Sequence, residues 1–498
     1  MSTLSVFLDV PLAQKLDGSL LKTYKQDDCP NKIFLAYRVC MTSEGQPWVS
    51  SVVRKTRLQI AQDPSLNYEY VPVKGMKSFI QACLELLFGK HSQVIMENRV
   101  GGVHTVGESG AFQLGAQFLK TWRRDSQIVY IISSQKEQHG LIFQDMGFTV
   151  YEYCLWDSKQ LCLDPNVLLN VVKQAPRGCV FVIGNIGNCK LTRCHWEKLM
   201  ATMKKKQIFP FFDIPYQGLS TGDLEEDTRF LQYFVSGGLE FFCSQSLSRN
   251  FGIYDEGVGI LAVVALNNQL LLCVLSQLVN LALALWLNPP TSGARIITSI
   301  LCNSALQEAW KQSLKEVVED IMLIKEKVKE KLRLLGTPGS WDHITNQSGT
   351  HCYLGLDFQQ VEYMVRKKHI YIPKNSRINF TCINACNIDY ITESINEAIL
   401  FTKGSGNYLQ KVNDSWWLEM HYKPGPQGAS SRTPYSLLSA GRDGFRVGLK
   451  SGCVREGEGG AQGREDVPAS SEENQELCPV EGQAGGLPNR ADRGDPQQ

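Results

Sequence analysis

The sequence lacks the signatures of several protein classes. Its formal net charge is only +1 over 498 residues, so it carries no electrostatic footprint for nucleic acid or an anionic membrane surface. None of its sixteen cysteines forms a Cys-x-x-Cys pair, which argues against a zinc site built from paired thiolates. Residues 1–9 are neither basic nor apolar enough for a secretory signal. We therefore expect reduced thiols and a cytoplasmic protein without a nucleic-acid partner.

A long uncharged stretch raises the question of a membrane span. No charged residue occurs between Gly257 and Ala294, and roughly 20 mostly apolar residues suffice to cross a bilayer. Polar residues such as Asn267, Gln269 and Asn280 interrupt the stretch, and Asn288-Pro289-Pro290 stops it. We expect a buried strand followed by a buried helix rather than a span.

The pattern of apolar residues predicts an α/β fold. Helical periodicity occurs at Met76–Phe88 and around Ala111–Leu119, and it alternates with short runs that are β-branched or aromatic. These strand candidates are Ile128–Ile132, Val180–Ile183, Phe209–Phe212, Leu239–Cys243 and Val258–Ala265. The alternation is typical of a largely parallel sheet covered by helices, which binds ligands at the carboxyl ends of its strands.

The last part of the sequence changes character twice. Residues 310–335 predict one long helix that ends at Gly336, and a smaller α/β segment follows to about residue 402. Residues 403–498 are rich in Gly, Ser, Pro, Glu and Arg and show no sustained periodicity. We expect this tail to be disordered.

One loop links the sequence to a known family. Ser244-Gln245-Ser246-Leu247-Ser248-Arg249-Asn250-Phe251-Gly252 resembles the Ser-x-Ser-Lys-Asn-Phe-Gly loop of the aspartate aminotransferases, enzymes that use pyridoxal phosphate. The resemblance extends from about residue 4 to 402. It implies fold type I, with a seven-stranded mixed sheet, and a homodimer with shared active sites. The implied parts are an arm with part of a small domain (1–47), a large cofactor domain (48–325), the rest of the small domain (326–402) and the tail (403–498).

The resemblance also assigns cofactor contacts. Asp213 matches the aspartate that pairs with the pyridine nitrogen of the cofactor, and His139 matches the histidine that hydrogen-bonds this aspartate. Tyr216 and Asn185 match the residues that bond the phenolic oxygen of the ring. Further matches, to residues that hold the phosphate, are Ser109, Ser246 and, from the partner chain, Tyr70.

Two arginines match the residues that bind substrate. Arg377 corresponds to the arginine that forks onto the α-carboxylate, and Arg295 to the one that reaches across the dimer to the distal carboxylate. Because a guanidinium suits bidentate carboxylate binding, the pair implies a dicarboxylic amino acid or oxo acid. The implied reaction is transamination between L-aspartate and 2-oxoglutarate.

Several positions depart from the family pattern. Arg249 stands where the family has the lysine that bonds the cofactor covalently and moves the substrate proton. Glu108 brings a negative charge to the phosphate turn, and Gly257 replaces the arginine that binds the phosphate. Lys136 replaces the tryptophan that stacks on the cofactor ring, and Leu35 replaces a glycine at the substrate gate.

The Arg249 position decides between two classes of function. A guanidinium stays protonated, so it neither condenses with an aldehyde nor acts as a base, although it could still pair with the phosphate. The chain is then either an impaired transaminase that holds its cofactor weakly or noncovalently, or a noncatalytic, dicarboxylate-binding subunit. Such a subunit could form a heterodimer with an active enzyme. A third reading assigns Arg249 and the tail to an allele, an alternative transcript or a gene-model error.

Overall fold

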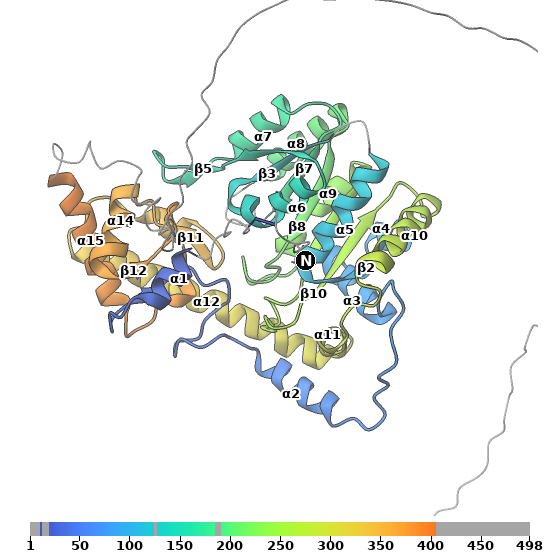
Figure 1. Cartoon of the computed structure of the whole chain (residues 1–498), viewed down its shortest axis with the longest axis horizontal. Helices are drawn as coiled ribbons and strands as arrows, with labels where there is room; N and C mark the ends of the chain where they lie inside the picture. The colour runs from blue at the N-terminus through green and yellow to red at the C-terminus, as the bar shows by residue number, and fades with distance from the viewer. Residues whose placement is uncertain (1–9, 12–18, 124–126, 185–190, 405–498) are drawn as a thin grey trace, which may run out of the picture. The chain divides into compact units, whose positions relative to one another are not determined.

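A seven-stranded sheet organises the structure. The computed structural model describes residues 10–11, 19–123, 127–184 and 191–404, and its sheet has the order β2-β10-β9-β8-β7-β3-β4 (Figure 1). β10 is antiparallel to both of its neighbours, whereas the pairs from β9 to β4 are parallel. The seven-stranded mixed sheet that the family resemblance implied is therefore confirmed. The strands are β2 (Val100–Val106), β3 (Ile128–Ile132), β4 (Thr149–Tyr153), β7 (Val180–Gly184), β8 (Phe209–Ile214), β9 (Phe241–Ser246) and β10 (Val258–Val264).

Each face of the sheet is covered by its own helices. Side chains alternate between the faces of a strand, so Phe211 of β8 packs in one apolar core and Phe212 in another. The Phe211 core includes side chains of α5 (Gly107–Trp122), α6 (Leu141–Asp145) and α10 (Asn268–Leu285). The Phe212 core includes side chains of α3 (Lys77–Phe88), α7 (Pro165–Gln174), α8 (Arg193–Lys206), α9 (Phe230–Ser236), α11 (Ser292–Leu301) and the long α12 (Ser304–Leu334).

A third apolar core joins distant parts of the sequence. It combines Leu35 with residues between Ile321 and Ile399, and α12 contributes to both this core and the Phe212 core. The predicted boundary at residue 325 falls inside α12, which continues unbroken to Leu334. The domain boundaries stay a prediction.

The long helix begins earlier than its periodicity indicated. The Asn303 side chain accepts from the backbone N–H groups of Ala305 and Leu306 at 3.1 Å, which satisfies donors that the first turn leaves free. The helix ends before Gly336, whose φ of +68° suits a residue without a Cβ. Because of the Asn303 cap, α12 includes six residues before its predicted start at residue 310.

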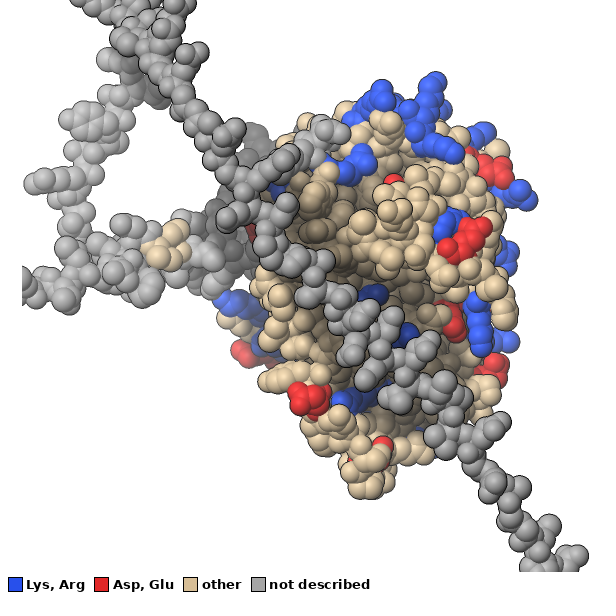
Figure 2. Space-filling model, turned by 90° about the vertical axis from the view of Figure 1, so that its right-hand side faces the viewer, with Lys and Arg blue, Asp and Glu red and all other residues tan. Residues whose placement is uncertain are grey.

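The helix of the uncharged stretch is not buried as expected. The strand before it, β10, is fully buried, but α10 buries only Leu271, Leu275, Leu278 and Ala282. Leu272 and Leu283 are 59% and 49% exposed, because a single helix can pack only one of its faces on a sheet. Among the described helices, α10 alone is long and apolar enough to cross a bilayer. Figure 2 shows this side, on which the area above the grey residues is mostly uncharged and basic and acidic residues are mixed along the edges.

The remaining elements are short or lie outside the main sheet. Three pairs of strands form two-stranded sheets: β1 (Ile33–Phe34) with β12 (Ile370–Tyr371), β11 (His351–Tyr353) with β13 (Arg377–Asn379), and β5 (Trp156–Asp157) with β6 (Cys162–Leu163). The other helices are α1 (Ser19–Gln26), α2 (Ser51–Ala61), α4 (Gln93–Met96), α13 (Asp342–Asn346), α14 (Phe358–Lys368) and α15 (Ile388–Gly404). Single turns are η1 (Ser133–Gln135), η2 (Lys136–Gly140), η4 (Glu226–Thr228) and η5 (Phe380–Cys382). The predicted disordered tail lies outside the described residues from 405 onward.

Candidate active site

The candidate site lies where the first turn of α5 meets the carboxyl ends of β8 and β9. Asp213 is two residues beyond Phe211 in β8, so its side chain lies on the sheet face that α5 covers. Glu108 is in the first turn of α5, and Arg249 follows the end of β9. The sheet therefore brings together residues more than 100 positions apart.

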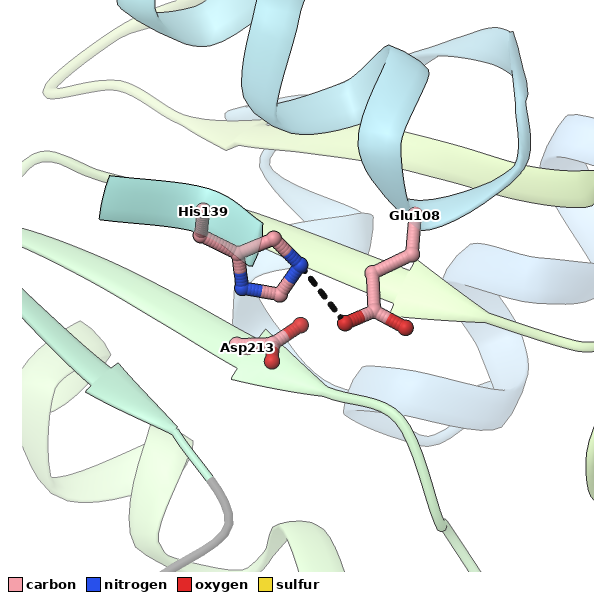
Figure 3. Close-up of side chains that lie close together, drawn as sticks. All are labelled: Glu108, His139 and Asp213. Atoms are coloured by element: carbon pink, nitrogen blue, oxygen red, sulfur yellow. Dashed lines mark ion pairs between the residues drawn. The ribbon is translucent and has the colours of Figure 1, made fainter. Parts of the chain in front are cut away.

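A buried charge cluster fills this corner (Figure 3). One carboxylate oxygen of Glu108 lies 2.5 Å from Nη1 of Arg249, and the other lies 2.9 Å from Nε2 of His139. Asp213 points toward the same group, and the ligand atoms of Glu108, His139 and Asp213 all lie within 4.8 Å of one another. Glu108, His139 and Asp213 are at most 8% exposed. The two carboxylates thus share one small, water-poor space.

Electrostatics hold Glu108 and Arg249 in their charged forms. Burial alone would raise the pKa of Glu108, but Arg249 and then His139 outweigh it and hold this pKa at about 2. Burial would likewise lower the pKa of Arg249, yet the nearby Tyr216, Glu108 and Asp213 raise it above its ordinary value. The Arg249 guanidinium also lies 4.8 Å from the centre of the Tyr216 ring, a cation–π geometry. Arg249 is therefore permanently cationic here.

Asp213 is the less satisfied carboxylate. Its Oδ2 accepts from Nε2 of Gln135 at 2.6 Å, whereas Oδ1 has no hydrogen-bond partner among the described residues. Burial, together with the negative charge of Glu108, raises the pKa of Asp213 to about 7. A buried, unpartnered carboxylate oxygen is costly and is suited to receiving a donor from a bound ligand.

The neighbours of Asp213 differ from those that the resemblance implied. His139 was expected to hydrogen-bond Asp213, but its Nε2 faces Glu108, and the side chain that donates to Asp213 is Gln135. The reason is that a carboxylate at position 108 attracts the imidazole. Lys136, at the ring-stacking position, forms an ion pair with Glu152 and is 43% exposed, so it points out of the site.

Two glycines lie close together where the family resemblance places the phosphate. The Cα of Gly257 is close to Gly107, since a Cβ added to Gly107 would lie 3.4 Å from it. Position 257, where the family has an arginine, thus adjoins the start of α5. Ser246 is buried at the end of β9, on the same strand face as Phe242, and Ser109 is exposed in α5.

The predicted substrate residues lie on other elements. Arg377 begins β13, opposite Tyr353, and its guanidinium is 6.0 Å from the Tyr353 ring. Arg295 is in α11 and donates to the carbonyl oxygen of Asn67 at 2.5 Å. Tyr70 is 80% exposed. Asn185 lies outside the described residues.

The sequence did not identify two features of the site. Gln135 was not among the expected residues, and only its position beside Lys136 hinted at it. The pairing of Glu108 with Arg249 was also missed, although both unusual residues had been recognised. Their opposite charges, at two loops that meet at one sheet edge, were the signal that could have found it.

Comparison with known proteins identifies the family. The family model for aminotransferase class I and II matches residues 31–395. A Bos taurus protein named "Putative aspartate aminotransferase, cytoplasmic 2" is 78% identical over 405 residues, covering 81% of this chain and all of that protein. The Gallus gallus "Aspartate aminotransferase, cytoplasmic" is 38% identical and covers 79% of this chain and 98% of that protein.

Solved structures agree with this match. The aromatic-amino-acid aminotransferase of Burkholderia pseudomallei, covalently bound to pyridoxal phosphate, has a TM-score of 0.75 at 26% identity and covers 80% of this chain and 100% of its own. The aspartate aminotransferase from Saccharomyces cerevisiae cytoplasm also has a TM-score of 0.75, at 28% identity, and covers 80% of this chain and 99% of its own. The chain therefore belongs to the class I and II aminotransferases, as an aspartate aminotransferase-like member.

Proposed function

We propose that this chain binds pyridoxal phosphate noncovalently together with a dicarboxylic amino acid or oxo acid, and that it transaminates L-aspartate and 2-oxoglutarate slowly. The observation that carries the proposal is the Arg249–Glu108 ion pair. It places a permanently charged guanidinium where the family has its reactive lysine. Losing a positioned base costs on the order of 10²–10⁴ in rate.

Several residues fit the proposed cofactor. Family membership and the pyridoxal-phosphate-bound neighbour support this cofactor, which supplies an electron sink when bound. The unpartnered Oδ1 of Asp213 would accept from the ring nitrogen, and Ser109 and Ser246 would bond the phosphate.

Other residues argue for weak binding. The guanidinium of Arg249 is already paired with Glu108, and Gly257 offers no cation beside the start of α5. Each charged hydrogen bond contributes about 1.5–3 kcal/mol. The absence of one such bond at position 257 alone would weaken the affinity for a phosphate by at least tenfold.

The substrate and assembly proposals rest on the arginines and on exposed residues. Arg377 would bind the α-carboxylate, and Arg295 of a second copy would bind the distal one. A homodimer is supported by the 80% exposure of Tyr70 and by the apolar outer face of α10, which a second copy would shield. Names of the relatives support a cytoplasmic location.

The alternative function is that of a noncatalytic subunit or dicarboxylate-binding protein. The Arg249–Glu108 pair favours it, because the pair neutralises the site internally. In this reading Tyr70 and Arg295 would complete the site of an active aspartate aminotransferase in a heterodimer. Co-expression of the two chains followed by pull-down tests the idea, and strict homodimers would exclude it.

Borohydride reduction with peptide mass spectrometry tests the main proposal. The purified protein, saturated with pyridoxal phosphate, is expected to show cofactor absorbance that dialysis removes, with no cofactor mass on the peptide that contains residue 249. Transfer of the amino group from labelled aspartate to 2-oxoglutarate should be slow but measurable. A protein that never binds the cofactor would overturn the proposal.

A further inference from the structure

The Glu108 side chain lies inside the site, where it contacts two other residues, and is not a surface charge. Its two oxygens contact Arg249 at 2.5 Å and His139 at 2.9 Å, and the residue is 8% exposed. Both contacts come from elements other than α5. The carboxylate is therefore held at the centre of the charge cluster, as a bound anion would be.

The position of this carboxylate conflicts with that of a ring. Ligand atoms of Glu108 lie within 4.8 Å of those of Asp213 (Figure 3). A ring nitrogen that donates to Oδ1 of Asp213 needs a heavy-atom separation of about 2.7–3.2 Å, so a bound ring would lie close to the Glu108 carboxylate. The ring and the present Glu108 side chain would therefore compete for this corner.

We propose that Glu108 is an autoinhibitory plug that must swing out of the site before pyridoxal phosphate binds. This inference rests on the proposed function and adds the regulation of the same site. Displacement of the plug does two things at once. It clears the space beside Asp213, and it releases the guanidinium of Arg249 to pair with the phosphate of the cofactor.

The charges of the cluster explain why the plug is stable without a ligand. Arg249 and Glu108 neutralise each other, and a buried guanidinium without a partner would be strongly unfavourable. The cofactor phosphate can replace Glu108 as the partner of Arg249 because it is also an anion. Binding is thus an exchange of one anion for another, and the affinity falls by the cost of removing the first.

The test is the affinity for pyridoxal phosphate in a set of variants of the full chain, measured by equilibrium dialysis with absorbance detection. Glu108→Ala removes the plug and is expected to bind at least tenfold more tightly than the unmodified protein, with Glu108→Gln in between. Glu152→Ala removes a partly exposed carboxylate from the Lys136 pair and should leave the affinity within about twofold.

A second variant protects the test against misfolding. If Glu108→Ala fails to fold because Arg249 loses its partner, the double variant Glu108→Ala with Arg249→Met removes both charges and should still bind more tightly than the unmodified protein. Equal affinities of the unmodified protein and the folded plug-less variants would overturn the plug and leave the proposed function standing. Failure of every variant to bind would overturn both.

Discussion

Arg377 and Arg295 stand where the family resemblance places arginines that bind carboxylates, whereas the guanidinium of Arg249 is already paired with Glu108. The same chemical group, a guanidinium, therefore occurs in two different settings. At Arg377 and Arg295 the family pattern is kept, and at Arg249 it is replaced. The difference teaches that the positions proposed to recognise a dicarboxylate are separate from the position of the covalent cofactor bond, so one can be replaced while the others are kept.

The largest effect is expected from Arg249→Lys, which restores the family residue at the replaced position. A lysine can lose its proton and act as a nucleophile and base, so we expect the rate of aspartate transamination to rise by about 10²–10⁴. A coupled assay of oxaloacetate formation measures it, with Arg249→Met as the control that removes the charge without supplying an amine. An unchanged rate in the lysine variant would show that Glu108 and Gly257 alone block the chemistry.

The pH dependence of stability tests the environment of Asp213. Its folded pKa of about 7 lies above the unfolded value of about 3.9, so the folded state binds more protons between these values. The contribution of Asp213 to the free energy of unfolding should therefore fall as pH rises from about 4 to 7, whereas the buried His104 and His351, whose folded pKa values are lowered by burial, contribute in the opposite direction.

Urea unfolding at pH 5 and pH 8 measures this change. Compared with the unmodified protein, Asp213→Asn, which cannot ionise, should lack the Asp213 contribution to the difference between the two pH values. The exposed Asp255→Asn should retain it. An identical pH dependence in all three proteins would contradict the buried, raised pKa of Asp213.

A smaller effect is expected on the substrate side. Arg377→Lys keeps the charge but loses the planar fork, and each charged hydrogen bond contributes about 1.5–3 kcal/mol. Calorimetric titration with succinate should show an affinity at least tenfold lower, whereas the exposed Arg193→Lys should change nothing. If both variants keep the affinity of the unmodified protein for succinate, Arg377 does not bind the ligand.

The smallest effect is expected at Lys136. Its ion pair with Glu152 is partly exposed, and such pairs contribute about 0–1 kcal/mol. Lys136→Ala should therefore leave cofactor affinity within about twofold, while Gln135→Ala, which removes the donor to Asp213, should change it more. The reverse order would restore Lys136 to the ring-stacking role that its position suggests.

Much of the fold could be predicted from the sequence because its signals are local. The strands at Ile128, Val180 and Phe209 and the helix at Met76–Phe88 were found within a few residues, since apolar periodicity fixes them. The exposed face of α10 could not be found this way, because burial depends on what packs against a helix. Periodicity also gave no sign that Asn303 extends α12.

The site was harder to predict from the sequence than the fold was, because its contacts are not local. Matching a family motif located Asp213, Arg249 and Glu108, but it assumed the family's partners for each of them. That His139 faces Glu108 rather than Asp213, and that Gln135 donates to Asp213 in place of His139, depends on side-chain rotation in a crowded corner. Single residues in a sequence carry no record of such competition.

The carboxylate in the first turn of α5 has one further consequence. A helix start attracts negative charge, and in many proteins a bound phosphate supplies it. Here the helix carries its own counter-ion in Glu108, so the fold gains little from a phosphate ligand. The level of this protein in cells should therefore be insensitive to the supply of vitamin B6, unlike that of a protein whose folding depends on its cofactor.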